Sequence, residues 1–193
     1  FKVIQSFVQL YFPNEKKRIN YHNYLEIRKT QRISNGDFYL KYISNEFFEE
    51  FKIYFKSEIE KIENLYYDSL ILNIDLFKEF RKNYSKDIFV LLSLRSNEQN
   101  SLKQLEYLNL NWYFDEVYFL KHSTQNPKTL FLRDYIKSNQ KYHFIGDSDT
   151  DYEAANSNGI IFDFVNTSIY SDKKNLIKNM DINQLLLSNL CYE

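Results

Sequence analysis

The stretch that decides the fold runs from Tyr142 to Ile160 and reads YHFIGDSDTDYEAANSNGI. Its apolar start is typical of a strand in a parallel sheet, and this strand ends at Gly146 and Asp147. Three acids, Asp147, Asp149 and Asp151, fall within five residues, and a helix rich in small residues follows. Two carboxylates, from Asp147 and Asp151, are tolerable at one point when a cation screens their charge. The stretch therefore predicts a magnesium-phosphate site at the end of a strand.

The same turn also fits a simpler role as the start of a helix. Ser148 and Asp151 have the spacing of a capping box, and Asp149 and Asp151 complement the partial positive charge of a helix N-terminus. Capping gives no reason for a Gly-Asp pair directly after a buried strand. We favour the site and keep capping as the alternative.

Composition limits the partners that this chain is expected to have. Its 193 residues are 44% hydrophobic, which suits one domain or a core with a modest insertion. Lys and Arg number 25 against 26 Asp and Glu, and no apolar run is long enough to span a bilayer. We therefore expect no nucleic acid and no membrane as partner. The single cysteine, Cys191, fits a reducing cytoplasm, and the sequence gives no signal for an oligomeric state.

From about residue 87 onward, apolar runs and amphipathic stretches alternate regularly. The order predicts an α/β fold, with a Rossmann-like parallel sheet covered by helices on both faces and functional groups at the carboxyl ends of the strands. The predicted strands are Ile88–Leu92, which we expect to be fully buried, Val117–Leu120, Tyr142–Ile145 and Ile160–Val165. The predicted helices are Glu98–Leu108, Pro127–Lys137 and one that contains Tyr152–Asn156.

Residues 1–70 have a different pattern, with aromatic and aliphatic residues at helical spacing and no buried strand. We predict two parts, an all-helical segment over 1–70 and an α/β core over 71–193. One interpretation of the helical segment is an unrelated helical domain packed beside the core.

The stretch from Tyr142 to Ile160 resembles the last motif of the haloacid-dehalogenase-like superfamily. In that family an apolar strand runs into Gly-Asp-Ser-x-x-Asp, followed by a small-residue helix and Gly-Ile. The matching residues are Gly146, Asp147, Ser148, Asp151, Ala154, Ala155, Gly159 and Ile160. Most members are phosphatases that need Mg²⁺ and pass the phosphoryl group through an aspartate. The resemblance implies that chemistry here, a helical cap after the first motif, and Asp147 and Asp151 as the metal-binding acids.

The resemblance also assigns a serine and an arginine. The family's second motif is a hydroxyl residue at the end of an apolar strand, where it binds a phosphoryl oxygen, and Ser93 matches it. Arg95 is the usual type of neighbour and is expected to help bind the substrate. A serine after a strand often caps the next helix instead, a role that Ser96 or Asn97 could also fill.

The family's third motif is a lysine that neutralises the nucleophile and the phosphate. Lys128 is favoured, because Pro127 at a helix start fixes how the next residue is presented. Lys121, at the end of the preceding strand, is the competitor. Either lysine could instead be a solvated surface residue.

The family's first motif, an Asp-x-Asp at the end of a separate first strand, is not in this sequence. Asp163 and Asp75 each lack the second acid that the motif requires. In the family, the strand of this motif lies between the strands of the second and last motifs, so those two strands would flank an empty position. We expect about a dozen or more residues upstream of Phe1 that form this strand and carry the nucleophile.

These observations predict a magnesium-dependent phosphatase that acts on a small phosphorylated metabolite. Ser93, Lys128 and Asp151 are the predicted catalytic residues, with Ser93, Arg95 and Lys128 binding substrate and Asp147 and Asp151 binding Mg²⁺. Asp151 would hold either a water on the metal or the lysine. The alternatives are a non-catalytic binding or scaffold protein of the same fold, and a phosphomutase.

Overall fold

The computed structural model describes residues 1–14, 20–31, 33–66, 72–165 and 180–190. The chain divides into two compact units, a helical unit of residues Phe1–Asp68 and an α/β unit of residues Ser69–Glu193. Whether the helical unit acts as a cap stays a prediction. Among the described residues, no helix has the length and apolar character needed to cross a membrane.

The helical unit is built around aromatic side chains. Phe7, Tyr39 and Phe51 are almost fully buried, and the rings of Tyr39 and Phe51 stack with their centroids 4.2 Å apart. Ser34 starts one helix with a reciprocal capping box to Asp37, in which each side chain satisfies a backbone N–H that the helix leaves free. The described helices are α1 (Lys2–Tyr11), α2 (Tyr21–Gln31), α3 (Asn35–Tyr42), α4 (Phe48–Glu58) and α5 (Ile62–Leu65).

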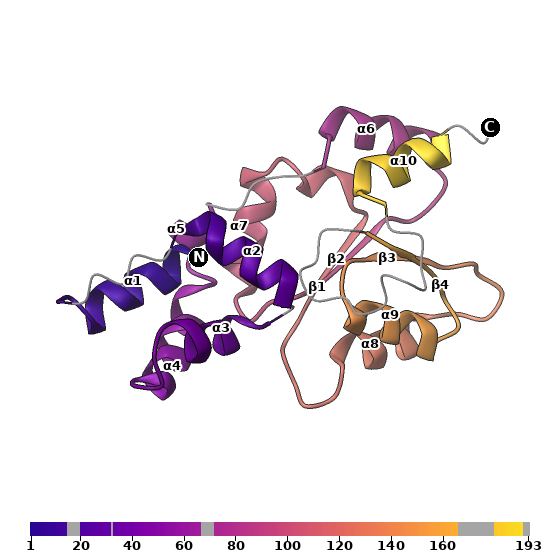
Figure 1. Cartoon of the computed structure of the whole chain (residues 1–193). Helices are drawn as coiled ribbons and strands as arrows, with labels where there is room; N and C mark the ends of the chain where they lie inside the picture. Colours follow the sequence, from indigo (N-terminus) through magenta and orange to yellow (C-terminus); the bar gives the residue numbers. More distant parts are fainter. Residues whose placement is uncertain (15–19, 32, 67–71, 166–179, 191–193) are drawn as a thin grey trace. The chain divides into compact units, whose positions relative to one another are not determined.

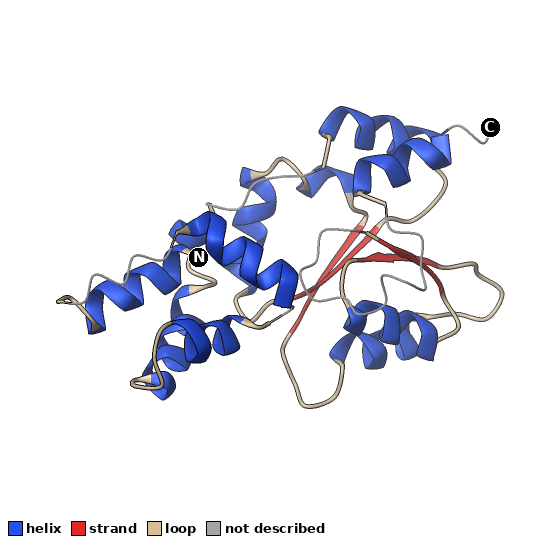
Figure 2. Ribbon diagram, viewed as in Figure 1, coloured by secondary structure: helices blue, strands red, loops and turns tan. Residues whose placement is uncertain are grey.

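The α/β unit has the alternating order that the sequence predicts. Its strands are β1 (Val90–Leu94), β2 (Glu116–Leu120), β3 (His143–Gly146) and β4 (Ile161–Phe164). Its helices are α6 (Ile74–Asn83), α7 (Glu98–Tyr107), the short η1 (Asn111–Tyr113), α8 (Pro127–Tyr135), α9 (Asp149–Ser157) and α10 (Ile182–Leu190). In Figures 1 and 2, α8 and α9 lie on one side of the strands, and α6 and α10 lie on the other.

Side chains alternate between the two faces of the β3–β4 pair. Phe144 and Phe162 share one face, with ring centroids 6.0 Å apart, and Tyr152 of α9 packs edge-on against Phe162. Ile145 and Ile161 belong to the other face and are 40% and 65% exposed. The face that carries the phenylalanines is therefore the one that α9 covers.

A carboxylate fixes α6 to the beginnings of β1 and β2. Asp115 accepts two hydrogen bonds from the Arg81 guanidinium, at 2.7 and 2.8 Å, and one from the Phe89 N–H at 2.8 Å. The hydrogen bond from the Phe89 N–H holds the pKa of Asp115 below its usual value, burial partly opposes this lowering, and the Arg81 charge adds to it. Asp115 thus joins α6 to the residue just before β1.

The expectation of a fully buried first strand is wrong. Strand β1 starts at Val90, and all five of its residues are only partly buried, while Ile88 lies before it and is 63% exposed. Parallel strands normally bury both faces and both edges. The exposure shows that the described residues do not complete the packing around β1.

The strands form two separate pairs within the described part of the chain. β1 pairs in parallel with β2, and β3 pairs in parallel with β4. Val165, just after β4, forms a parallel bridge with Met180. Because no described strand joins β1 to β3, each of these two strands keeps one edge without a ladder partner.

Candidate active site

Gly146 and Asp147 form the turn between β3 and α9. A Cβ atom at position 146 would lie 2.5 Å from Asp151 Cβ and 2.8 Å from Asp151 Cγ, closer than real Cβ contacts. Only glycine lets the strand end approach the first turn of α9 this closely. The glycine of the Gly-Asp pair, which capping did not explain, therefore has a steric reason.

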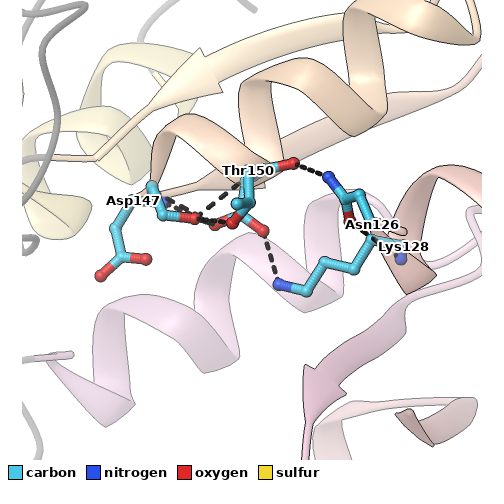
Figure 3. A network of polar contacts seen from close by, with 6 residues as sticks. Asn126, Lys128, Asp147 and Thr150 are labelled. Carbon is cyan, nitrogen blue, oxygen red and sulfur yellow. Dashed lines mark hydrogen bonds and ion pairs between the residues drawn. The ribbon is translucent and has the colours of Figure 1, made fainter. Parts of the chain in front are cut away.

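Asp151 accepts hydrogen bonds from Lys128, Ser148 and Asp147, and these contacts belong to the polar network drawn in Figure 3. The Oδ2 atom of Asp151 accepts hydrogen bonds from Ser148 Oγ at 2.7 Å, the Ser148 N–H at 3.2 Å and the Asp147 N–H at 3.3 Å. Ser148 Oγ in turn caps the Asp151 N–H, so the predicted capping box is present. Asp151 is 3% exposed, and a buried carboxylate needs such donors to offset the loss of water.

The other oxygen of Asp151 binds the predicted lysine. Lys128 Nζ lies 2.5 Å from Asp151 Oδ1, and the two side chains are 13% and 5% exposed. Lys128 is the second residue of α8, directly after Pro127. The competitor Lys121 follows β2 and is exposed. The structure thus brings Lys128 to the acids of the last motif.

The Asp147 carboxylate is oriented differently from the Asp151 carboxylate. In Figure 3 it points away from the network that Asp151 organises. Mg²⁺ prefers carboxylate and water oxygens and commonly uses one or two protein carboxylates. Asp147 fits one such ligand. The described residues contain no group of three or more His, Cys, Asp or Glu side chains able to hold a metal, so further ligands would be water, substrate or other parts of the protein.

Ser93 and Arg95 lie at the carboxyl end of β1. Ser93 is opposite Phe119 of β2, and its hydroxyl forms no hydrogen bond within the described residues. Asn97 caps α7 by accepting from the Asn100 N–H, so Ser93 does not have the capping role. The Arg95 N–H donates to Leu120 O, while its guanidinium pairs with no described residue. No hydrogen bond links either residue to the Asp151 network, and their roles toward a substrate stay predictions.

Asn126 belongs to the same network and is missing from the predicted set. Its Oδ1 accepts from the Lys128 N–H at 3.1 Å, and its Nδ2 donates to Thr150 O at 2.8 Å. Asn before Pro is a recognisable helix start, so the cap was accessible from the sequence. The bond to Thr150 joins residues 24 positions apart, and only the tertiary structure reveals it.

Solved structures supply a comparison for the whole chain. A haloacid-dehalogenase-like hydrolase from Streptococcus pneumoniae has 14% identity and a TM-score of 0.62, and the match covers 97% of this chain and 90% of that one. A predicted phosphatase from Clostridium acetobutylicum has 18% identity and a TM-score of 0.61, covering 97% and 87%. Protein Tyrosine Kinase A from Mycobacterium tuberculosis has 13% identity and a TM-score of 0.63, covering 98% and 90%. No protein-family model and no curated protein sequence matches the chain.

These likenesses show the fold. The chain has the Rossmann-like α/β fold of haloacid-dehalogenase-like hydrolases, as its last motif predicts. Because one of the compared proteins is named a kinase and the others a hydrolase and a phosphatase, the fold alone does not fix the reaction.

Proposed function

We propose that this chain belongs to a magnesium-dependent phosphatase that hydrolyses a small organic phosphate through an aspartyl-phosphate intermediate. The observation that carries the proposal is the buried Lys128–Asp151 ion pair directly beside Asp147. A structural ion pair is costly to bury, whereas a site that receives a phosphoryl group needs a fixed cation. Strongly organised charge of this kind is typical of functional sites.

Each residue has a defined task in this proposal. Asp151 holds the Lys128 ammonium, and Lys128 neutralises charge that builds on the phosphoryl oxygens. Ser93 donates its hydroxyl to one of those oxygens, and Arg95 assists at the same strand end. Mg²⁺, bound by Asp147, would supply further charge neutralisation. Because both oxygens of Asp151 already accept hydrogen bonds, we assign Asp151 to the lysine and not to direct metal binding.

The nucleophile is proposed to lie on a strand between β1 and β3. Support comes from the two separate strand pairs and from the exposure of β1, because a parallel strand placed there would satisfy both unpaired edges. Its carboxyl end would carry an Asp-x-Asp sequence, in which the first acid attacks phosphorus and the second transfers the proton.

The rival is a non-catalytic binding protein of the same fold. It is favoured by one observation, that this sequence has no Asp-x-Asp outside the last motif to supply a nucleophile and a general acid. Acids held together without a metal are unfavourable, so the rival must explain why Asp147, Asp149 and Asp151 are all present.

The test measures hydrolysis of a panel of phosphate esters by the natural full-length protein, with Mg²⁺ and with a chelator. We expect turnover only with Mg²⁺. Asp147→Asn should lower kcat/KM about 100-fold or more, because the loss of metal-based charge neutralisation is worth several kcal/mol. Asp149→Asn removes the same charge from the same turn and is the matched control, with near-normal turnover expected.

Two results would decide against the phosphatase. A full-length protein that binds Mg²⁺ yet hydrolyses no ester supports the binding protein. Equal activity of the parent and Asp147→Asn would show that the metal assignment is wrong.

A further inference from the structure

Two helices, α8 and α9, carry the two partners of the buried ion pair. Lys128 is in the first turn of α8, and Asp151 is in the first turn of α9. A lysine side chain has many rotamers and a rotatable point charge, so its ammonium is precise only where its surroundings hold it. The relative placement of the two helix starts therefore decides where the Lys128 charge lies.

Asn126 joins these two helix starts. Its side-chain oxygen accepts from the backbone N–H of Lys128, and its side-chain amide donates to the backbone oxygen of Thr150, the residue before Asp151. The bridge thus holds the backbone on both sides of the ion pair, at 3.1 and 2.8 Å (Figure 3). An amide side chain is needed, because one end must accept while the other donates.

We propose that Asn126 is a positioning residue, which holds the Lys128 ammonium against Asp151 and beside the Asp147 turn. Its effect on turnover rests on the proposed function, but its effect on Lys128 does not. Groups that orient the residues of a site affect activity although they do not touch the substrate.

The same helix pair contains a second asparagine bridge that serves as a control. Asn158 Nδ2 donates to Thr129 O at 3.2 Å and to Ala154 O at 2.8 Å. Asn158 follows the last turn of α9, seven residues beyond Asp151, which corresponds to about 10 Å along the helix. It stabilises the packing of α8 on α9 without touching the first turn of α9.

The experiment compares Asn126→Ser with Asn158→Ser in the full-length protein. Serine keeps the helix cap at position 126 but is too short and has no amide to donate to Thr150 O. Each variant is treated with an acetylating reagent, and the acetylation rate of Lys128 is measured by mass spectrometry relative to the exposed Lys121 of the same molecule. Thermal melting monitors the fold in parallel.

We expect Asn126→Ser to raise the relative acetylation of Lys128 about fivefold, the factor that corresponds to the loss of one hydrogen bond. Asn158→Ser should lower the melting temperature about as much as Asn126→Ser does. It should leave the acetylation of Lys128 unchanged. In the active protein, Asn126→Ser should lower kcat about 10- to 100-fold with KM nearly unchanged. Asn126→Asp, which also caps but lacks the donor, should again expose Lys128 if the serine variant folds poorly.

Unchanged Lys128 acetylation in the Asn126 variants would overturn the inference. It would also be overturned if Asn158→Ser raised Lys128 acetylation as much as Asn126→Ser does, because the bridge would then contribute only to ordinary helix packing. A parent protein without turnover would remove the proposed function, and the acetylation comparison would still decide the role of Asn126.

Discussion

Gly146 is the residue on which the close approach of β3 to α9 depends. A Cβ atom there would overlap the Asp151 side chain, which lies directly above the strand end. The Asp147 and Ser148 N–H groups reach Asp151 Oδ2 only because this space is empty. The absence of a Cβ atom at position 146 thus allows the Asp151 carboxylate to take the orientation in which it binds Lys128.

We therefore predict that Gly146→Ala lowers the free energy of unfolding by about 1–3 kcal/mol, the usual cost of overpacking. Urea denaturation measures the loss. Gly36→Ala is the matched control, because its added Cβ would meet only ordinary contacts at 3.6 Å and because alanine is the better helix former. Equal stability of Gly146→Ala and the parent would show that the strand end can shift without cost.

At the scale of elements, β3 and β4 are joined by a pair of ionisable side chains as well as by their ladder. His143 Nε2 lies 2.6 Å from Asp163 Oδ2, on the face of the pair opposite the phenylalanines. The hydrogen bond to Asp163 raises the pKa of His143, and partial burial opposes the rise. The imidazolium form therefore stabilises the folded strand pair.

The sign of the pH dependence follows from that raised pKa. The stabilisation is fully present below the unfolded-state pKa of about 6.5 and is lost as the pH rises through the higher folded-state pKa. Asp163→Asn should therefore destabilise the protein more at about pH 6 than at about pH 8.5. Urea denaturation at the two pH values measures the difference. In a His143→Gln background the pH dependence of the Asp163 effect should disappear, and a constant effect in both backgrounds would contradict the ion pair.

At the scale of the whole α/β unit, the pairing of the strands predicts which backbone amides of β1 and β3 have no ladder partner. The Arg95 N–H donates to Leu120 O of β2, so by alternation Ser93 also faces β2 while Leu92 faces the other edge. Gly146 O accepts from the Val165 N–H on the β4 side, so the Ile145 N–H faces away from β4.

Hydrogen exchange on this chain should show the alternation directly. The Leu92 and Ile145 amides should exchange quickly, and the Ser93 and Phe144 amides slowly, because only the latter belong to a ladder. In a protein that supplies the proposed middle strand, the first two amides should become protected. Slow exchange at Leu92 and Ile145 in this chain would show that another segment already occupies the edge and that no strand is missing between β1 and β3.

The sequence by itself determined the type and order of the elements in the α/β unit, because each depends on local patterns. The apolar run before Gly146 predicted β3 to within one residue at each end, and Pro127 and Ser148 predicted the starts of α8 and α9. Asp147, Asp151 and Lys128 were identified as candidates for the same reason, since strand ends and helix starts are visible in a single sequence.

Only the tertiary structure decided which of these residues meet. The sequence favours Lys128 over Lys121 only through Pro127, and the packing of α8 on α9 is what brings Lys128 to Asp151. The Asn126–Thr150 bridge, the space at Gly146 and the partial exposure of β1 likewise depend on neighbours far along the chain. Local patterns fix the backbone conformation, whereas burial and pairing are properties of the assembled sheet and helices, and no single stretch of sequence contains them.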